Sequence, residues 1–302
     1  YSSKDKKLVT LDEYIERKSL DITVESINGV TKTHNLRYES YNIQPFQLGK
    51  VFNGNVGYIA LSSFEELNSG GSSSKMKRSI DSTFSVFGDK KINKLIVDLR
   101  YNGGGYVSTA IYLLNKIINS SGNEKVMFKY DVNKNLKRER DEGDTEFNDE
   151  IFAKNNSTEI TRVVFLVSDY TASASEIVIS ALMPYMDVQL VGHDPATYGK
   201  PVGFFREDIS DDIGLWAASF KITNANGFTD YWDGIKADYY GYDNIHKILG
   251  DPTEDMTKKG LDLLQGTGAS ARASTRVSSS LNSNRGQIRE LNKIPLRNMI
   301  KD

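Results

Sequence analysis

The chain has 302 residues, a net charge of −2 and charged side chains at 26% of positions, so it can form a large domain with a buried core. The balanced charge gives no basic surface for a polyanion, and nucleic acid is not expected as a partner. The absence of cysteine excludes disulfides, a thiol nucleophile and cysteine-bound zinc. No apolar run reaches the roughly 18 residues that cross a bilayer, and the first residues carry no apolar signal core, although leaders are removed on maturation.

The first part of the chain, from residue 8 to residue 41, has the pattern of a short helix followed by two alternating strands. A turn at Asn28-Gly29 joins these strands. This part is too short to be a complete domain.

Strands and helices alternate through the middle of the chain, which predicts an α/β fold. The expected strands are 56–64, 94–100, 162–168, 188–194 and 219–225, and the expected helices are 75–88, 109–118 and 176–186. Between them, residues 121–160 are polar and charged and predict a surface excursion rather than core. Residues 265–286 are rich in Gly, Ser and Ala and predict a loose extension before a short final segment.

A first candidate loop, Asn102-Gly103-Gly104-Gly105, follows an apolar strand and precedes a helix. Its amides can hold an anion or a developing oxyanion, because glycine places no side chain in the way. A simple chain-reversing turn is an equally good explanation of three glycines. The spacing does not fit a dinucleotide-binding fingerprint.

A second candidate loop, Thr171-Ala172-Ser173-Ala174-Ser175-Glu176, places small residues at a strand-to-helix junction. A serine hydroxyl can be exposed there for attack on a carbonyl. The alternative is that Ser173 and Glu176 only form a capping box at the start of the helix.

A serine nucleophile needs a base, and the next loop offers Lys200 between glycines, a proline and large apolar residues. Burial against residues such as Val202, Phe204 and Phe205 would favour the neutral amine that a base requires. A solvent-exposed lysine in a turn is the alternative.

Several ordered segments resemble the tail-specific, or C-terminal processing, serine proteases of peptidase family S41. They are VGYIALSSF, LIVDLRYNGGG, VFLVSDYTASASEIVISAL and VGHDPATYGKPVG, followed by YWDGIKADYY and LGDPTEDMTKKGLDLL. The resemblance covers roughly residues 46–265. It implies a ClpP/crotonase-like α/β catalytic domain with strand-loop-helix repeats, preceded by a partial PDZ-like β-rich segment in residues 1–45 and followed by a flexible extension in residues 266–302.

The resemblance also implies roles for individual residues. Ser173 would be the nucleophile, with Ser175 as the second choice, and Lys200 would be its general base. The backbone amides of Ala174 and Gly104 would form the oxyanion hole. No metal or organic cofactor is required for this chemistry.

The sequence departs from the family pattern in three places. Only the second half of the PDZ-like domain, which in the family captures a substrate's C-terminus, has a counterpart. Phe204 stands where many members have a glutamine that positions the lysine, so other contacts must orient Lys200. Where relatives have Gly-Glu-Pro, this chain has Gly192-His193-Asp194-Pro195, which makes His193 an alternative base.

The expected activity is acyl transfer from peptide bonds near the exposed C-terminus of a protein or peptide substrate. Two alternatives stay open: a catalytically inactive ligand-binding member of the same fold, and an esterase or amidase that uses Ser173 with His193. The resemblance suggests a bacterial cell-envelope location, periplasmic or lipid-anchored. The oligomeric state does not follow from the sequence.

Overall fold

The computed structural model describes residues 19–266, apart from residues 27, 38, 40–43, 54, 70, 144–146 and 211–212. The chain divides into two compact units, residues 1–43 and residues 44–302. The predicted N-terminal helix and the predicted flexible extension after residue 266 lie outside the described residues.

The first unit contains an antiparallel pair of strands, β1 (Ser19–Glu25) and β2 (Thr31–Arg37). They are joined at the predicted Asn28-Gly29 turn, where Gly29 has a φ of +75° that favours glycine. The PDZ-like character of this unit stays a prediction.

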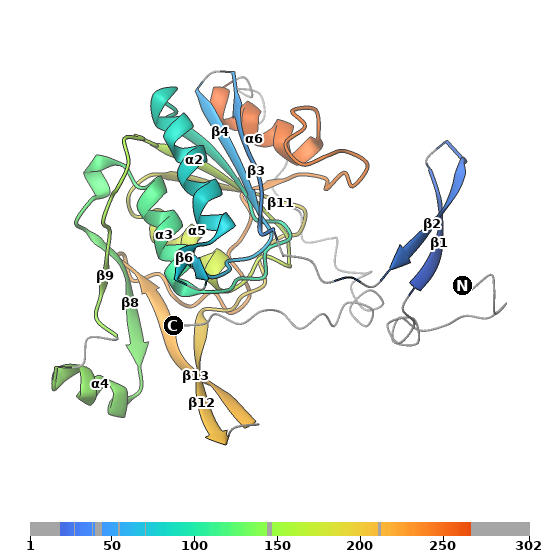
Figure 1. Ribbon diagram of the computed structural model, residues 1–302. Helices are drawn as coiled ribbons and strands as arrows, with labels where there is room; N and C mark the ends of the chain where they lie inside the picture. The colour runs from blue at the N-terminus through green and yellow to red at the C-terminus, as the bar shows by residue number, and fades with distance from the viewer. Residues whose placement is uncertain are drawn as a thin grey trace. The chain divides into compact units, whose positions relative to one another are not determined.

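A six-stranded sheet forms the centre of the second unit, in the order β14-β11-β10-β7-β4-β3 (Figure 1). All neighbours are parallel except the edge strand β3, which is antiparallel to β4. The strands are β3 (Phe46–Phe52), β4 (Val56–Leu61), β7 (Lys94–Asp98), β10 (Arg162–Val167), β11 (Asp187–Gly192) and β14 (Tyr239–Tyr240). Because parallel strands end at a common edge, the loops after β7, β10 and β11 lie next to one another.

Helices cover both faces of this sheet, which explains why its strands are apolar at successive positions. Helices α2 (Lys75–Asp89), α3 (Val107–Ile117) and α5 (Ala174–Leu182) share one core with Leu95, Val97 and Phe165. Helix α6 (Asp255–Gln265) packs against the alternate strand residues Ile96 and Val164 on the opposite face. The α/β fold predicted from the sequence is therefore confirmed.

A second, antiparallel sheet has the order β12-β13-β8-β9. Its strands are β8 (Val126–Val132), β9 (Glu150–Ile151), β12 (Val202–Ser210) and β13 (Ile213–Asn224). β8 contributes the buried Met127, Phe128 and Tyr130 to the core. The expectation that residues 121–160 form only a surface excursion is thus wrong, because alternate apolar residues of β8 face inward between its charged ones.

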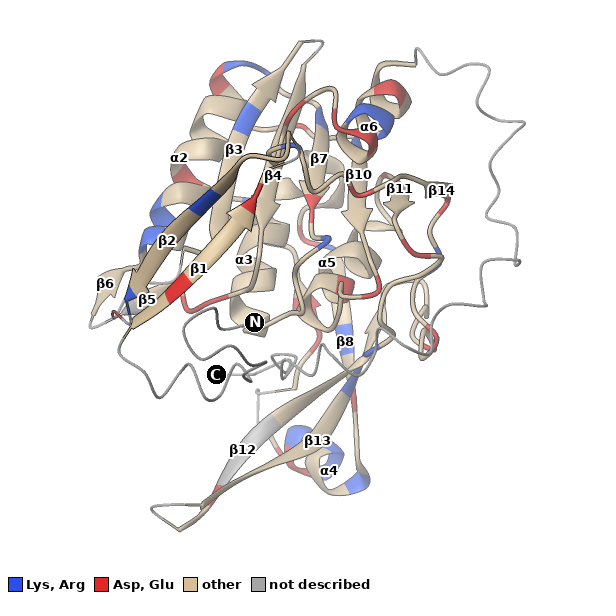
Figure 2. Ribbon diagram, turned by 90° about the vertical axis from the view of Figure 1, so that its right-hand side faces the viewer, with Lys and Arg blue, Asp and Glu red and all other residues tan. Residues whose placement is uncertain are grey.

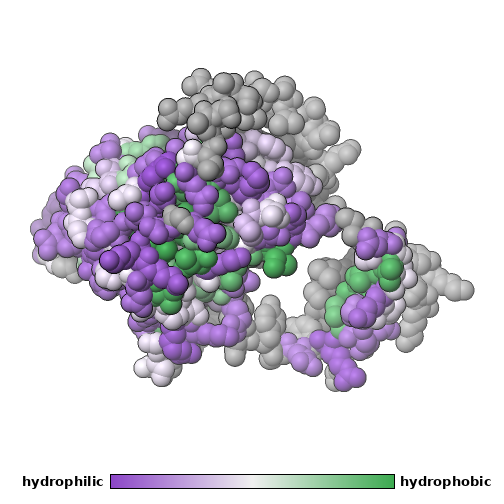
Figure 3. All heavy atoms as spheres, turned by 90° about the horizontal axis from the view of Figure 1, so that it is seen from above, coloured by the Kyte–Doolittle hydropathy of each residue, from purple (hydrophilic) through white to green (hydrophobic). Residues whose placement is uncertain are grey.

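Short elements complete the unit. They are β5 (Asn68–Ser69), β6 (Ser72–Ser73), the 3₁₀ turn η1 (Ser120–Gly122) and the polar helix α4 (Lys134–Asp141). Seen from above, most of the surface is hydrophilic, with hydrophobic residues gathered toward the middle of the body (Figure 3). Within the described residues, no helix is both long and apolar enough to span a membrane.

Candidate active site

Three loops at the carboxyl edge of the parallel sheet are tied together by hydrogen bonds. The Thr171 hydroxyl donates to the Leu99 carbonyl at 2.8 Å, and the Ala172 amide donates to the Asn102 carbonyl at 3.2 Å. The Tyr198 amide donates to the Thr171 carbonyl at 2.9 Å. The loops that carry the predicted oxyanion glycine, the predicted nucleophile and the predicted base therefore form one connected structure.

Ser173 lies at the turn from β10 into α5, in a strained backbone conformation with φ of 62° and ψ of −118°. A non-glycine residue is held at such angles only when its surroundings impose them, and such residues concentrate at functional sites. The side chain is fully buried, and its Oγ has no hydrogen-bond partner within the described part of the chain. Ser173 and Glu176 do occupy the capping-box positions of α5, as the alternative expected, but the hydrogen bond found there is the one from the Ser173 amide to the carboxylate, and it leaves the hydroxyl available.

The Glu176 carboxylate joins the nucleophile loop to the lysine loop. Its Oε2 accepts hydrogen bonds from the amides of Ser173 and Lys200, each at 2.8 Å. Its Oε1 accepts from the Thr197 hydroxyl at 2.6 Å and from the Gly199 amide at 2.9 Å. Since one oxygen receives both amides, the Ser173 and Lys200 backbones are held within two hydrogen-bond lengths of each other.

The Glu176 side chain is buried, and this burial raises the pKa of its carboxyl group. The hydrogen bonds from Thr197 and from the three amides oppose that rise. The sequence pattern identified Glu176 only as a capping residue. Its bond to the Ser173 amide is one half of a capping box, but its bonds across to residues 197–200 could not be deduced from local spacing.

Lys200 is partly buried, and desolvation lowers the pKa of its amine, against the opposing effect of the Glu176 charge. Its Nζ lies 4.7 Å from the centroid of the Phe204 ring. The residue that replaces the family's glutamine thus contacts the lysine directly, and the aromatic ring contributes to its orientation.

The loop that carries Lys200 is packed too tightly to shift easily. A Cβ atom on Gly199 would lie 2.3 Å from the Trp232 carbonyl oxygen, and one on Gly234 would lie 2.1 Å from the Thr197 carbonyl oxygen. The Ile235 amide also donates to the Thr197 hydroxyl at 2.8 Å. Close backbone packing therefore fixes the segment that precedes the lysine.

The glycine loop lies directly against Ser173, the predicted nucleophile. A Cβ atom on Gly104 would be 2.8 Å from the Cβ of Ser173 and 3.1 Å from the Ala174 nitrogen. Ala174 is the first residue of α5, so its amide is one of the helix's donors without an intrahelical acceptor. The Gly104 amide, in contrast, donates to Asn102 Oδ1 at 2.9 Å. An oxyanion at the Gly104 amide must therefore displace the Asn102 side chain.

Asn102 itself was not singled out as a site residue by the sequence. It is fully buried, and its Nδ2 has no hydrogen-bond partner among the described residues. A buried amide nitrogen that lacks an acceptor is costly unless a ligand or a change of side-chain orientation satisfies it.

Ser175 and His193 have other contacts. The Ser175 hydroxyl donates to the Asn102 carbonyl at 3.0 Å and so helps to join the two loops. His193 Nδ1 accepts from the Asp243 amide at 3.2 Å, and its ring lies near Tyr240 and Tyr242. The neighbouring Asp194 accepts from the Asp169 amide at 3.1 Å. None of these contacts involves Ser173, so they do not tie either secondary candidate to it.

A buried ion cluster surrounds Arg100, which precedes the glycine loop by two residues. The Arg100 guanidinium bonds Asp98, Glu254 and Asp243, and Tyr58 donates to Asp98 at 2.6 Å. Arg100 keeps its charge because these carboxylates raise its pKa against the effect of burial. The cluster links the end of β7 to the start of α6, where Glu254 caps the helix.

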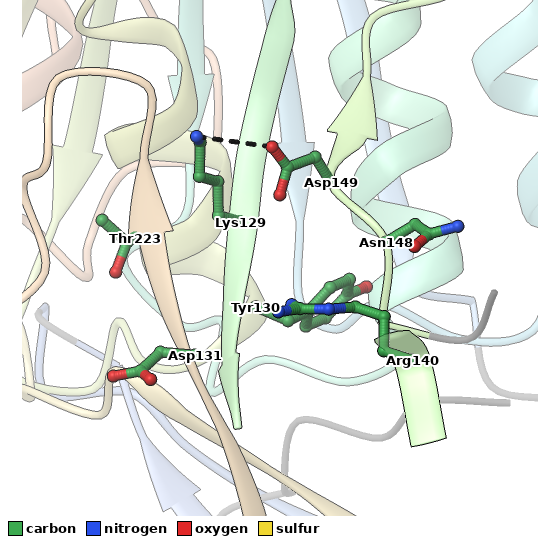
Figure 4. A pocket seen from close by; sticks show the side chains of 7 residues that line it. All are labelled: Lys129, Tyr130, Asp131, Arg140, Asn148, Asp149 and Thr223. Carbon is green, nitrogen blue, oxygen red and sulfur yellow. Dashed lines mark ion pairs between the residues drawn. The ribbon is translucent and has the colours of Figure 1, made fainter. Parts of the chain in front are cut away.

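A polar pocket of about 650 Å³ lies elsewhere, on the second sheet beside α4 (Figure 4). Its lining residues are Lys129, Tyr130, Asp131, Arg140, Asn148, Asp149 and Thr223, none of which belongs to the three loops. The charges are balanced, and Lys129 pairs with Asp149 at 3.4 Å. Within the described ranges, no group of three or more His, Asp or Glu residues could hold a metal ion.

The comparisons with known proteins agree with this arrangement. A family model described as peptidase family S41 matches residues 55–240. No curated protein matches the chain. A crystal structure of a Bacteroides fragilis protein assigned as an S41 protease is similar with a TM-score of 0.66 and 21% identity, over 82% of this chain and 66% of that one.

Two further solved structures share the fold. The photosystem II D1 C-terminal processing protease has a TM-score of 0.51 and 18% identity, over 81% of this chain and 60% of that protein. A protein from Parabacteroides merdae assigned as a peptidase has a TM-score of 0.50 and 18% identity, over 74% of this chain and 68% of its own. The chain thus spans about two thirds or less of the length of the first two structures.

Proposed function

Since the chain belongs to peptidase family S41, we propose that it is a serine endopeptidase in which Lys200 acts as general base toward Ser173. The observation that carries the proposal is the shared carboxylate oxygen of Glu176, which holds the backbones of both residues. The strained backbone of Ser173 and its hydroxyl without a hydrogen-bond partner in the described chain are a second support.

In the proposed reaction, the neutral Lys200 amine takes the proton from the Ser173 hydroxyl as Oγ attacks a peptide carbonyl. The resulting ammonium then gives this proton to the leaving amine, and an acyl-enzyme remains. Water, deprotonated by the same amine, attacks the ester and releases the new C-terminus. Partial burial of Lys200 supports this role because it lowers the pKa of the amine.

The negative charge that develops on the carbonyl oxygen needs donors beside Ser173. We place the Ala174 amide in this role, because it begins α5 and lies against the glycine loop. Gly104 is the second donor once Asn102 Oδ1 has moved away from its amide, a movement that would also release the buried Asn102 side chain.

The substrate is proposed to be a polypeptide that is cleaved near its C-terminus, in a bacterial cell envelope. Residues 1–45 would be the remaining half of a PDZ-like segment, residues 46–265 the catalytic domain and residues 266–302 an extension. These assignments rest on the family resemblance.

The proposal is tested by cleavage of casein by the wild type, Ser173→Ala, Lys200→Ala and His193→Ala, each checked for folding by circular dichroism. Wild type and His193→Ala are expected to cut, whereas the Ser173 and Lys200 variants are expected to be inert. Activity in Lys200→Ala together with inactivity in His193→Ala would support the Ser-His hydrolase instead. A wild type that is folded and inert, and that does not react with a serine-directed phosphonate, would support a ligand-binding role.

A further inference from the structure

The hairpin formed by β12 and β13 extends beyond the body of the second unit (Figures 1 and 2). The inner half of β13 pairs with β8 through residues 220–224 and contributes the buried Phe220 and Ile222 to the core. The outer half, Ile213–Ala218, pairs only with β12 among the described strands and is exposed at every position. We call Ile213–Ala218 the outer segment of β13.

The outer segment of β13 is unusually apolar for an exposed edge. Ile213 is 58% exposed, Leu215 51% and Trp216 40%. The segment contains no charged residue, and Figure 2 shows the corresponding part of β13 without charge. Proteins normally protect such edges with charges, prolines or bulges, because an open apolar strand pairs readily with another chain. Register shifts interrupt the pairing of β12 with β13 near both ends of the outer segment, at Phe204 and at Ser210, and no strand of the described residues covers the other edge between them, which makes this edge a candidate binding surface.

The inner end of this edge lies at the level of the candidate base. Phe204 pairs with Ala218, the last residue of the outer segment, and the Phe204 ring lies 4.7 Å from Lys200 Nζ. β8 pairs with β13 from Val132 onward and so blocks any added strand beyond this level. Because β12 occupies one edge of β13, a peptide that paired with the outer segment would lie along the opposite edge, one strand away from Phe204, and would end at the level of Phe204.

We propose that the outer segment of β13 binds the polypeptide substrate as an added β-strand and leads it to Ser173 and Lys200. This inference rests on the proposed peptidase function and specifies how its substrate is held. Main-chain hydrogen bonds to the edge supply affinity for an extended chain of any sequence. Leu215 and Trp216, which point to opposite faces of the strand, favour apolar substrate side chains.

Binding is measured on Ser173→Ala, which cannot complete turnover, so the result does not depend on whether the protein is a peptidase. The probe is a ten-residue peptide of alternating valine and serine, and the readout is tryptophan fluorescence. The chain has two tryptophans. A blue shift is expected in Ser173→Ala and in Ser173→Ala/Trp232→Phe, but not in Ser173→Ala/Trp216→Phe. A blue shift that is lost in Ser173→Ala/Trp232→Phe and kept in Ser173→Ala/Trp216→Phe would overturn the proposal.

Strand pairing is tested with two N-methylated forms of the peptide, one methylated at every valine and the other at every serine. Alternate amides of a strand point to opposite edges, so one form loses the hydrogen bonds to β13 and the other keeps them. We expect one form to bind at least tenfold more weakly than the other. Equal binding of both forms would exclude an added strand.

The position of the binding edge is tested with matched variants. Leu215→Asp in the Ser173→Ala protein is expected to weaken peptide binding at least fivefold. Ile248→Asp makes the same change at a residue that is 80% exposed outside the hairpin, and it is expected to leave binding unchanged. Equal effects of the two variants would overturn the proposal. So would a peptide-free dimer, detected by sedimentation and abolished by Leu215→Asp, because the edge would then be occupied by a second copy of the chain.

Discussion

The loop that carries Ser173 and the hairpin that begins after Lys200 differ in how the fold supports them. Ser173 lies between β10 and α5, and every residue of α5 is buried. β12 and β13, in contrast, pack against the core only at their inner ends. The proposed nucleophile is thus fixed by the same packing that stabilises the domain, while the proposed base lies at the boundary between the core and an exposed β-hairpin. The difference suggests that chemistry is fixed by the first region and substrate contact by the second.

Glu176 is the main connection between these two regions, so its removal should have the largest effect. In Glu176→Ala, the donors from Ser173, Thr197, Gly199 and Lys200 lose their common acceptor. Casein cleavage should fall at least ~100-fold, since small misplacements of catalytic groups have effects of that order. The free energy of unfolding should fall by about 3 kcal/mol or more, because several buried donors are left unsatisfied.

Glu159→Ala is the control for this change. Its carboxylate also accepts a backbone amide, from Ser120 at 2.9 Å, but its side chain is 53% exposed and lies outside the three loops. Its cleavage rate should equal that of the wild type. Full activity in Glu176→Ala would show that the two loops hold their geometry without the carboxylate.

The contrast in packing can be measured with one substitution made in each region. Leu95→Ala truncates a fully buried side chain of the central sheet and should lower the free energy of unfolding by about 2–5 kcal/mol. Leu215→Ala makes the same truncation on the outer segment of β13 and should change it by less than about 0.5 kcal/mol. Urea denaturation checks both values, and a large loss in Leu215→Ala would mean that the hairpin is part of the cooperative core.

Gly104→Ala tests how closely the glycine loop approaches the nucleophile. The added Cβ would lie 2.8 Å from the Ser173 Cβ, so Ser173 must move, and cleavage should fall roughly 100-fold. Gly143→Ala is the matched control, because Gly143 has a similar φ, +115° against +107°, and no atom of the described residues lies within 4 Å of its added Cβ. It should cost about 1 kcal/mol of backbone strain and leave cleavage unchanged. Equal loss of activity in both variants would assign the effect to backbone strain alone.

Much of the fold was predictable because the parallel strands are buried on both faces and therefore appear as continuous apolar runs, as in Lys94–Asp98 and Arg162–Val167. β8 was missed because Lys129 and Asp131 alternate with the buried Phe128 and Tyr130, and charges dominated the composition of the whole segment. The local sequence pattern identifies a strand most clearly when both of its faces are apolar. It was less informative for β8, because only one face of this strand is buried.

The candidate site was predictable as a set of loops but not as a network. The small residues around Ser173 and the glycines around Gly104 identified the loops, because both patterns leave space for a substrate to approach the chain. The bonds of Glu176 to residues 197–200 and the bond between Asn102 and the Gly104 amide depend on which loops meet in space. The contact between the Phe204 ring and Lys200 likewise could not be predicted, because it depends on the direction in which the two side chains point.

The smallest expected effect concerns Phe204, which tests how the hairpin changes the pKa of Lys200. A cation–π contact favours the ammonium form by roughly 1 kcal/mol, so the ring is expected to oppose the lowering of the Lys200 pKa by burial. In the proposed mechanism the amine acts only when neutral, so activity should rise as the pH rises through the pKa of Lys200 and should be lost below it. In Phe204→Leu the pKa should fall further, and the midpoint of the kcat/KM profile should move to lower pH.

Phe52→Leu is the control for this shift, because Lys50 Nζ lies 5.0 Å from the centroid of the Phe52 ring in a similar contact outside the site. Its profile should match that of the wild type. Lys200→Arg should be inactive at every pH, since a guanidinium does not give up its proton in this range. A midpoint that moves upward in Phe204→Leu would mean that the ring acts mainly by excluding water from the amine, and the contribution of the hairpin to the base would then be desolvation rather than attraction.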